Sequence, residues 1–336
     1  MALKEARIEA AYVALETAFT IEDVEELRRR VEAGWRSEQD TERLRARAVR
    51  VCATALLEDV ERVRASQDTT ELRAVGLEAV RTAGKDTLCA MAVHAAAQDG
   101  VDVNTRAEGA AGEESLLRVA AKRGLVKTVG ALLQAGAKVN LVSSHGATAL
   151  HVAARGHVEI LRALMAAGAE VDHANHGGYT ALRVAAQNGH VDAILALVEA
   201  GAEVDHVSSH GGTALSAAAV TGHVDAIRAL VAAGAEVNHA NNSGMTALFA
   251  AAERGHSEAL RALVAAGAEV NHASNGGYTA LYAAAENGHM EALRALLEAG
   301  ADPNRADNDG LTPLSAAQTK NYQVVALALV QAGATE

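Results

Sequence analysis

The sequence contains few aromatic, cysteine and proline residues. Only 2% of its 336 residues are Phe, Trp or Tyr, although half are apolar. An extensive core therefore requires small side chains, mainly alanine, that pack closely between helices. The two cysteines, Cys52 and Cys89, lie in alanine-rich segments without the spacing of metal ligands, which indicates buried thiols and no disulfide.

Long apolar runs and clusters of positive charge are also missing. Charged residues are scattered through residues 1–19, so this segment has neither the apolar core of a signal peptide nor the length of a membrane span. We expect a soluble, cytoplasmic protein. The formal net charge of −12 excludes nucleic acid as the expected partner, because binding to a phosphate backbone relies on clustered Lys and Arg.

What the sequence does contain is a repeat. The triplet Thr-Ala-Leu, or Thr-Pro-Leu in the last copy, recurs with steps of 32 residues once and 33 residues four times. Its threonines are Thr148, Thr180, Thr213, Thr246, Thr279 and Thr312. A period of this length predicts a stacked array of repeats, each of which contacts its neighbours.

Each repeat has the punctuation of two short helices and a loop. In residues 235–268, Thr246 has the place of a helix N-cap, and the first helix is expected to end near Gly255. A second helix follows His256 and ends at Gly267, where a left-handed backbone conformation is needed. The remaining residues, rich in Asn, Ser and Gly, predict a hairpin-like finger.

This pattern resembles the ankyrin repeat, whose signature runs D-x-x-G-x-T-P-L-H, two alanines, G-H, and a second helix ending in A-G-A-D-V-N. The resemblance covers residues 113–336 in seven copies, and Ser115 opens the first copy. The chain keeps the histidine after the leucine only at His151; its replacements are Arg183, Ser216, Phe249, Tyr282 and Ser315. The resemblance implies an all-α ankyrin solenoid of helix-turn-helix repeats with β-hairpin-like fingers, preceded by an N-terminal helical module.

Two domains are expected, a helical module at residues 1–110 and the array at residues 111–336. Residues 24–34 and 93–104 resemble parts of the repeat, and we interpret both as degenerate copies. Residues 105–114 then form a finger that is three residues longer than the next one. The repeat that Thr148 opens lacks one residue near Arg155, which predicts a first helix shortened at its C-terminal end or a tighter turn between its helices.

Thirteen of the fourteen histidines lie in the array, and their positions favour structural roles. Five follow the glycine between two helices and are expected to bond backbone groups: His157, His190, His223, His256 and His289. Four others recur at the start of each finger: His173, His206, His239 and His272. Neighbouring copies should lie about 8 to 10 Å apart, whereas zinc needs donor atoms at about 2 Å. Local sites that pair His173 with His176 or His206 with His210 lack a complete ligand set, so we expect no metal, no cofactor and no catalytic residues.

The positions of the rare aromatic residues favour a binding function. Ankyrin-family proteins usually bind partners through the finger tips and the exposed side of the first helices, which line a concave groove. The resemblance places ten residues of this chain there: His176, Tyr179, Gln187, His210, Met245, Phe249, Glu253, Tyr278, Tyr282 and Glu286. Exposed aromatic residues commonly anchor interfaces. An alternative role for Phe249 and Tyr282 is to fill the gap left by the missing histidine.

The leading interpretation is a non-catalytic scaffold or adaptor, monomeric on its own, that holds a partner protein in this groove. Glu253 and Glu286, with the negative net charge, favour a neutral or basic peptide or helix as the partner. One alternative is a structural subunit that docks through its N-terminal module or its rather apolar last helix, which contains Val324, Val325, Leu327, Leu329 and Val330. Another is an enzyme whose activity resides in residues 1–110, where no catalytic motif is found.

Overall fold

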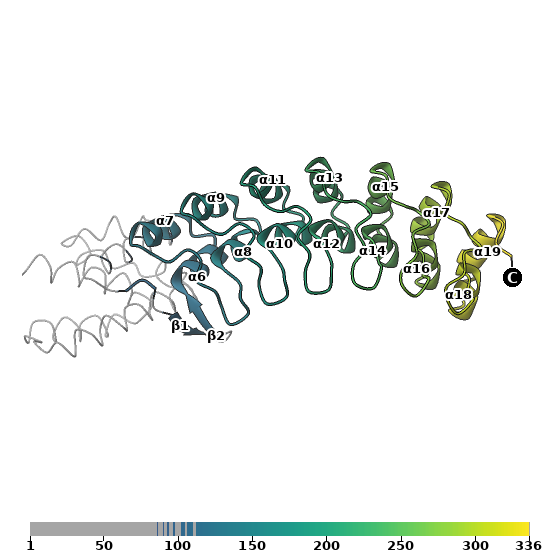
Figure 1. Cartoon of the computed structure of the whole chain (residues 1–336), viewed down its shortest axis with the longest axis horizontal. Helices are drawn as coiled ribbons and strands as arrows, with labels where there is room; N and C mark the ends of the chain where they lie inside the picture. The colour runs from purple at the N-terminus through teal and green to yellow at the C-terminus, as the bar shows by residue number, and fades with distance from the viewer. Residues whose placement is uncertain are drawn as a thin grey trace, which may run out of the picture. The chain divides into compact units, whose positions relative to one another are not determined.

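The computed structural model describes residues 86, 90, 93, 97, 102–104, 106–109 and 112–335 (Figure 1). Most of the expected N-terminal module, including the degenerate copy at residues 24–34, lies outside these residues, as do Cys52 and Cys89. The chain divides into two compact units: Met1–Ala153 with Glu159–Glu170, and Ala154–Val158 with Val171–Glu336. The described residues contain no helix that is long and apolar enough to cross a membrane.

The first unit begins, among the described residues, with helical positions at 86, 90, 93 and 97. An antiparallel hairpin of β1 (Arg106–Gly109) and β2 (Gly112–Ser115) follows. This hairpin confirms the expected lengthened finger. Four helices complete the unit: α6 (Leu116–Lys122), α7 (Val126–Gln134), α8 (Ala149–Ala153) and α9 (Val158–Ala166).

Helix α8 carries the expected local defect. It has five residues, two fewer than α6, and a turn at residues 154–156 leads to α9, which keeps the nine residues of α7. Gly156 absorbs the change, with φ of 116° where the corresponding Gly189 has 71°. The deleted residue therefore shortens the first helix and leaves the second intact, as the spacing predicts.

The second unit contains five further helix pairs in two layers (Figure 1). The first helices are α10 (Ala181–Gln187), α12 (Ala214–Thr221), α14 (Ala247–Glu253), α16 (Ala280–Glu286) and α18 (Pro313–Thr319). The second helices are α11 (Val191–Glu199), α13 (Val224–Ala232), α15 (Ser257–Ala265), α17 (Met290–Glu298) and α19 (Gln323–Gln331). Each first helix packs on the first helix of the next pair, and each second helix does likewise. The described residues thus hold seven helix pairs, which confirms the predicted all-α repeats.

The core runs through the stack and is built from leucine and alanine. Leu215, Leu248 and Leu281, at the start of three successive first helices, are each 1% exposed, as predicted. The second helices add residues such as Leu260 and Leu263, which are fully buried. Alanines on the first helices, such as Ala185, Ala218 and Ala251, have no exposed surface, and their small side chains let neighbouring helices approach closely. This packing explains how an aromatic-poor chain forms an extensive core.

Threonine side chains start the first helices, as the repeated triplet predicts. Thr246 Oγ1 accepts a hydrogen bond from the backbone N–H of Phe249, and Thr180, Thr213, Thr279 and Thr312 cap their helices in the same way. An N-cap of this kind satisfies one of the donors left unpaired at a helix start. Because the cap defines where the helix begins, the residue before each threonine lies at the junction of finger and helix.

Histidines between the helices join each repeat to the preceding one. The Nε2 atoms of His256 and His289 lie 3.1 Å from the backbone oxygens of Val220 and Glu253 in the preceding repeats. The ring of His256 also packs on Gly222, where an added Cβ would lie 2.7 Å from Nδ1. These contacts confirm the predicted backbone role for two of the five histidines.

Asparagine side chains form a second link between repeats. Asn238 Oδ1 accepts from the backbone N–H of Glu269 at 2.8 Å, and its Nδ2 donates to the Gly267 oxygen at 3.2 Å. Asn104, Asn140, Asn271 and Asn304 make the same pair of bonds to the repeat that follows each of them. Asn104, the last residue of the segment interpreted as a degenerate copy, therefore bonds to the repeat that follows it as the asparagines of the regular repeats do.

Candidate protein-interaction surface

Each finger of the second unit places one residue just before the capping threonine. We call these positions the finger column: Tyr179, Gly212, Met245, Tyr278 and Leu311. We call the finger column and the residues of the fingers and first helices around it the finger surface. These surrounding residues are His176, Gln187, His210, Val220, Glu253 and Glu286. Tyr179, Met245 and Tyr278 are half-buried in the structure, and Leu311 is 46% exposed. The column therefore places partly exposed apolar side chains in four of five consecutive repeats.

Each finger is held in shape by one side-chain oxygen at its base. Asn241 Oδ1 accepts from the backbone N–H groups of Ser243 and Met245 at 2.9 and 3.0 Å. Asn175 and Asp307 bond the equivalent amides of their own fingers. Because one of the two amides belongs to the column residue, the same interaction fixes the turn and positions the column side chain.

The finger tips also bond to one another along the stack. The backbone N–H of Asn275 donates to the oxygen of Ser243 at 3.0 Å, and its side-chain Nδ2 donates to the oxygen of Asn242, also at 3.0 Å. Asn242 and Asn308 repeat both bonds to the finger before each of them. This ladder couples the fingers, so a ligand would meet a preorganised surface and lose little entropy in ordering it.

Tyr278 is the most closely supported aromatic residue of the column. Its ring centroid lies 4.9 Å from that of Tyr282, and the two ring planes are tilted by 48°. The ring also packs against Gly276, where an added Cβ would lie 2.7 Å from Cε2. The glycine thus leaves room for the tyrosine that follows two residues later. A half-buried ring held on two sides is well suited to anchor a partner.

Tyr179 is supported by a different neighbour. The guanidinium carbon of Arg183 lies 4.5 Å from the centroid of the Tyr179 ring, within the range of a cation–π contact. Arg183 Nη1 donates to the backbone oxygen of Thr213 in the next repeat at 2.7 Å. Burial lowers the pKa of Arg183, and the contact with Tyr179 opposes that effect. Arg183 occupies the position of the family histidine, so this replacement supports the column residue of its own repeat.

Phe249 and Tyr282 require a correction, because they do not lie on the surface. Phe249 is 8% exposed and Tyr282 is 6% exposed. Each is the third residue of a first helix, in an N-terminal turn that is packed into the stack. Burial, followed by the charges of Glu286 and Asp307, raises the pKa of Tyr282 to about 12. These residues fill the space left by the missing histidine, which is the alternative role considered from the sequence. Tyr282 still acts at the surface indirectly, because Tyr278 packs on it.

The other predicted positions form a polar border. His176, Gln187, His210 and Glu253 are exposed, and Glu286 is half-buried. The Glu253 carboxylate lies 3.7 Å from Nε of Arg254, and the Glu286 carboxylate lies 3.9 Å from Nζ of Lys320. Ion pairs this exposed are worth little, so both carboxylates stay available to a positive group.

The sequence interpretation missed two apolar members of this surface. Leu311 completes the finger column, and the 33-residue step from Tyr278 identifies it. Val220, 39% exposed, occupies in α12 the position that Glu253 has in α14. Both could have been found by reading every repeat at the same position instead of searching for aromatic residues alone.

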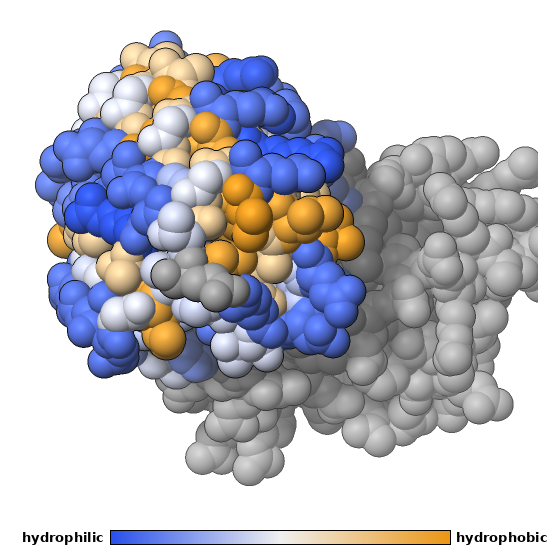
Figure 2. Space-filling view, turned by 90° about the vertical axis from the view of Figure 1, so that its right-hand side faces the viewer, coloured by the Kyte–Doolittle hydropathy of each residue, from blue (hydrophilic) through white to orange (hydrophobic). Residues whose placement is uncertain are grey.

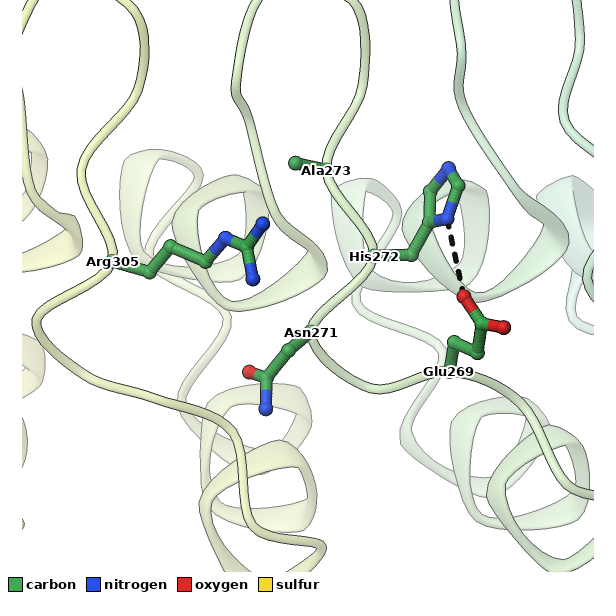
Figure 3. Close-up of a pocket in the computed structure, with 5 residues that line it drawn as sticks. All are labelled: Glu269, Asn271, His272, Ala273 and Arg305. Atoms are coloured by element: carbon green, nitrogen blue, oxygen red, sulfur yellow. Dashed lines mark ion pairs between the residues drawn. The ribbon is translucent and has the colours of Figure 1, made fainter.

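A shallow pocket of about 540 Å³ lies at the base of two neighbouring fingers (Figure 3). Its lining consists of Glu269, Asn271, His272, Ala273 and Arg305, none of which was predicted as a site residue. His272 lies 3.5 Å from the Glu269 carboxylate through Nδ1, and its Nε2 lies 3.1 Å from the oxygen of Gly244. Asn271 makes the same two hydrogen bonds to the next repeat as Asn238. Three of the five residues are therefore engaged in structural contacts.

The histidines at the start of the fingers also have structural partners. His239 repeats the contacts of His272, with its Nε2 3.1 Å from the oxygen of Gly211 and its Nδ1 3.4 Å from Glu236. His206 lies 3.1 Å from Glu203. Within the part of the chain that the structure describes, no three His, Cys, Asp or Glu side chains gather closely enough to hold a metal ion.

Comparisons with known proteins agree with the repeat architecture. A family model for ankyrin repeats in three copies matches residues 91–175, 116–208, 200–274 and 267–335. The crystal structure of the human ASB11 ankyrin repeat domain is similar to this chain, with 28% sequence identity and a TM-score of 0.61; the match covers 66% of this chain and 100% of that domain. A search of curated proteins found no match. The family match starts at residue 91, before the expected start of the array at residue 111.

Proposed function

Because this chain belongs to the ankyrin-repeat family, whose repeats are generally protein-interaction modules, we propose that it is a non-catalytic scaffold that binds a partner protein on the finger surface. The observation that carries the proposal is the placement of Tyr179 and Tyr278. In a chain with only 2% aromatic residues, both are partly exposed, and both rings are held by neighbouring side chains. Rigid aromatic side chains bind at a low cost in conformational entropy.

The partner that suits this surface is a neutral or basic peptide or helix. Apolar anchors would contact Tyr179, Met245, Tyr278 and Leu311, which follow one another along the stack. Basic side chains at the edge would approach Glu253 and Glu286, whose present ion pairs are long and exposed. Such an arrangement, with apolar anchors inside a polar border, is typical of protein interfaces.

The proposal is tested with peptides selected for binding to the full chain from a random displayed library. Their affinities are then measured by titration calorimetry against the wild-type chain and Tyr278→Ala. We expect the substitution to weaken binding by about 1 to 4 kcal/mol, because the ring would be an interface anchor. The melting temperature should change little, since the ring is half-buried and lies at the edge of the core.

A matched control separates the finger surface from the rest of the molecule. Leu195 is 50% exposed and lies on a second helix, α11, away from the fingers. Leu195→Ala should leave peptide affinity unchanged. The proposal fails if the selected peptides bind Tyr278→Ala and Tyr179→Ala as tightly as the wild-type chain.

A further inference from the structure

Helix α19 exposes an apolar stripe that the other second helices of its unit lack. Val324, Leu327 and Val330 are 70%, 58% and 53% exposed, and we call these three residues the α19 stripe. Their spacing of three residues places them along one side of the helix. The view onto this end of the molecule shows apolar side chains gathered among polar ones (Figure 2).

At the positions of Val324 and Leu327, three preceding helices carry charged residues. Asp225–Arg228 on α13, Glu258–Arg261 on α15 and Glu291–Arg294 on α17 form ion pairs of 3.3, 3.7 and 3.3 Å there. The repeat itself therefore does not require apolar residues there. Large exposed apolar groups on one face commonly mark an interaction site.

The sequence of α19 favours a second copy of this chain as the occupant of the stripe. The helix reads QVVALALVQ, which is nearly the same in both directions: Leu327 is central, Val324 mirrors Val330, and Gln323 mirrors Gln331. Two such helices crossing antiparallel about a twofold axis would bring Leu327 against Leu327, and Val324 against Val330 of the second copy. A twofold contact needs this kind of self-complementary surface.

Charge favours the same occupant. The chain has a formal net charge of −12, so most contacts between two copies would bring acidic groups together. Helix α19 has no charged residue, whereas α13, α15 and α17 each have several. Two copies can therefore meet at α19 without direct repulsion between their contact faces.

We propose that this chain forms a twofold dimer through the α19 stripe, in addition to binding a partner on the finger surface. This inference replaces the expectation of a monomer and does not depend on the proposed function. A dimer of this kind would hold two finger surfaces in one particle, which would strengthen binding to a partner with two binding segments.

Sedimentation velocity of the full chain over a concentration series tests the proposal. We expect a concentration-dependent monomer–dimer equilibrium for the wild-type chain. The double substitution Val324→Glu with Leu327→Arg restores the residues found in α15 and α17, so it should keep the fold. It should raise the dimer dissociation constant at least about tenfold, because both copies lose their central contacts.

Two further variants make the result specific. Leu195→Arg gives α11 the arginine that α13, α15 and α17 have at the corresponding position. It should leave the dissociation constant unchanged. Val324→Glu with Val330→Lys should dimerise more tightly than Val324→Glu with Val330→Glu, because an antiparallel contact brings residue 324 of one copy to residue 330 of the other. A wild-type chain that stays monomeric over the whole series would overturn the proposal. A dimer that Val324→Glu with Leu327→Arg leaves intact would also overturn it.

Discussion

At the scale of single residues, a glycine controls the position of Tyr278, the proposed aromatic anchor. The ring of Tyr278 lies directly over Gly276, and its other side meets Tyr282. A methyl group at position 276 would lie within 3 Å of the ring edge. The ring can move aside toward solvent because it is half-buried, whereas the backbone of the finger is fixed by its hydrogen bonds.

Gly276→Ala is therefore expected to weaken peptide binding while the aromatic residue itself remains. The loss should be smaller than that of Tyr278→Ala, since the ring is displaced and not removed. Titration calorimetry with the library-selected peptides measures the loss, and a thermal melt checks the fold. Equal affinity for Gly276→Ala and the wild-type chain would mean that the ring position does not matter for binding.

Tyr282 gives the stability of the folded protein a defined response to high pH. Its folded-state pKa is about 12, above the value of about 10 for an unfolded tyrosine. The folded protein therefore holds the phenolic proton more tightly, and this contribution is complete below pH 10 and lost as the pH rises from 10 to 12. Once the residue is fully ionised, this difference between the folded and unfolded pKa values corresponds to about 3 kcal/mol of unfolding free energy.

Urea denaturation of the wild-type chain and Tyr282→Phe at pH 9 and pH 11 measures this effect. Phenylalanine cannot ionise, so the wild-type chain should lose more stability than the variant between the two pH values. The same loss in both proteins would show that Tyr282 does not ionise differently in the folded and unfolded states.

At the scale of the elements, two repeats lack one of the two hydrogen bonds that Asn238 makes to the repeat that follows it. Asp172 and Asp205 have the position of Asn238 in their own repeats and accept from the backbone N–H groups of Glu203 and Glu236 at 2.9 and 3.0 Å. A carboxylate has no donor, so it cannot make the second bond that Asn238 makes to Gly267.

Asp205→Asn should raise the free energy of unfolding by about 0.5 to 1.5 kcal/mol, because the amide can donate to the Gly234 oxygen as well. The reverse change, Asn238→Asp, is its matched control and should lower stability by a similar amount. Chemical denaturation of both variants tests this link between repeats. A destabilised Asp205→Asn would show that the carboxylate has a role that its hydrogen bonds do not reveal.

At the scale of the whole molecule, the 33-residue period predicted most of the fold. The repeated threonine and glycine positions predicted where the first helices begin and the shortened α8, because caps and turns are local effects. Burial was harder to predict, because it depends on the neighbouring repeat. His151, Phe249 and Tyr282 follow the leucine of the triplet and are buried, whereas Arg183 has the same position and is half-buried.

The finger surface could be predicted only in part, because the exposure of its residues also depends on the neighbouring repeat. A chemical search for aromatic residues identified Tyr179 and Tyr278, but it passed over Leu311, which has the same position in the next repeat. It could not identify the neighbours that support the rings, since Tyr278 packs on Tyr282 and Tyr179 on Arg183 only after folding. The sequence thus indicated which residue types suit an interface, and packing determines which of them are exposed.

Hydrogen–deuterium exchange of the full chain, with and without a library-selected peptide, tests the central claim most directly. The account predicts slower exchange on peptide binding at the fingers around Asn175–Tyr179, Asn241–Met245 and Ser274–Tyr278, with no change in α11 or α13. Protection confined to residues 1–110 or to the second helices, with unchanged exchange in these fingers, would contradict it.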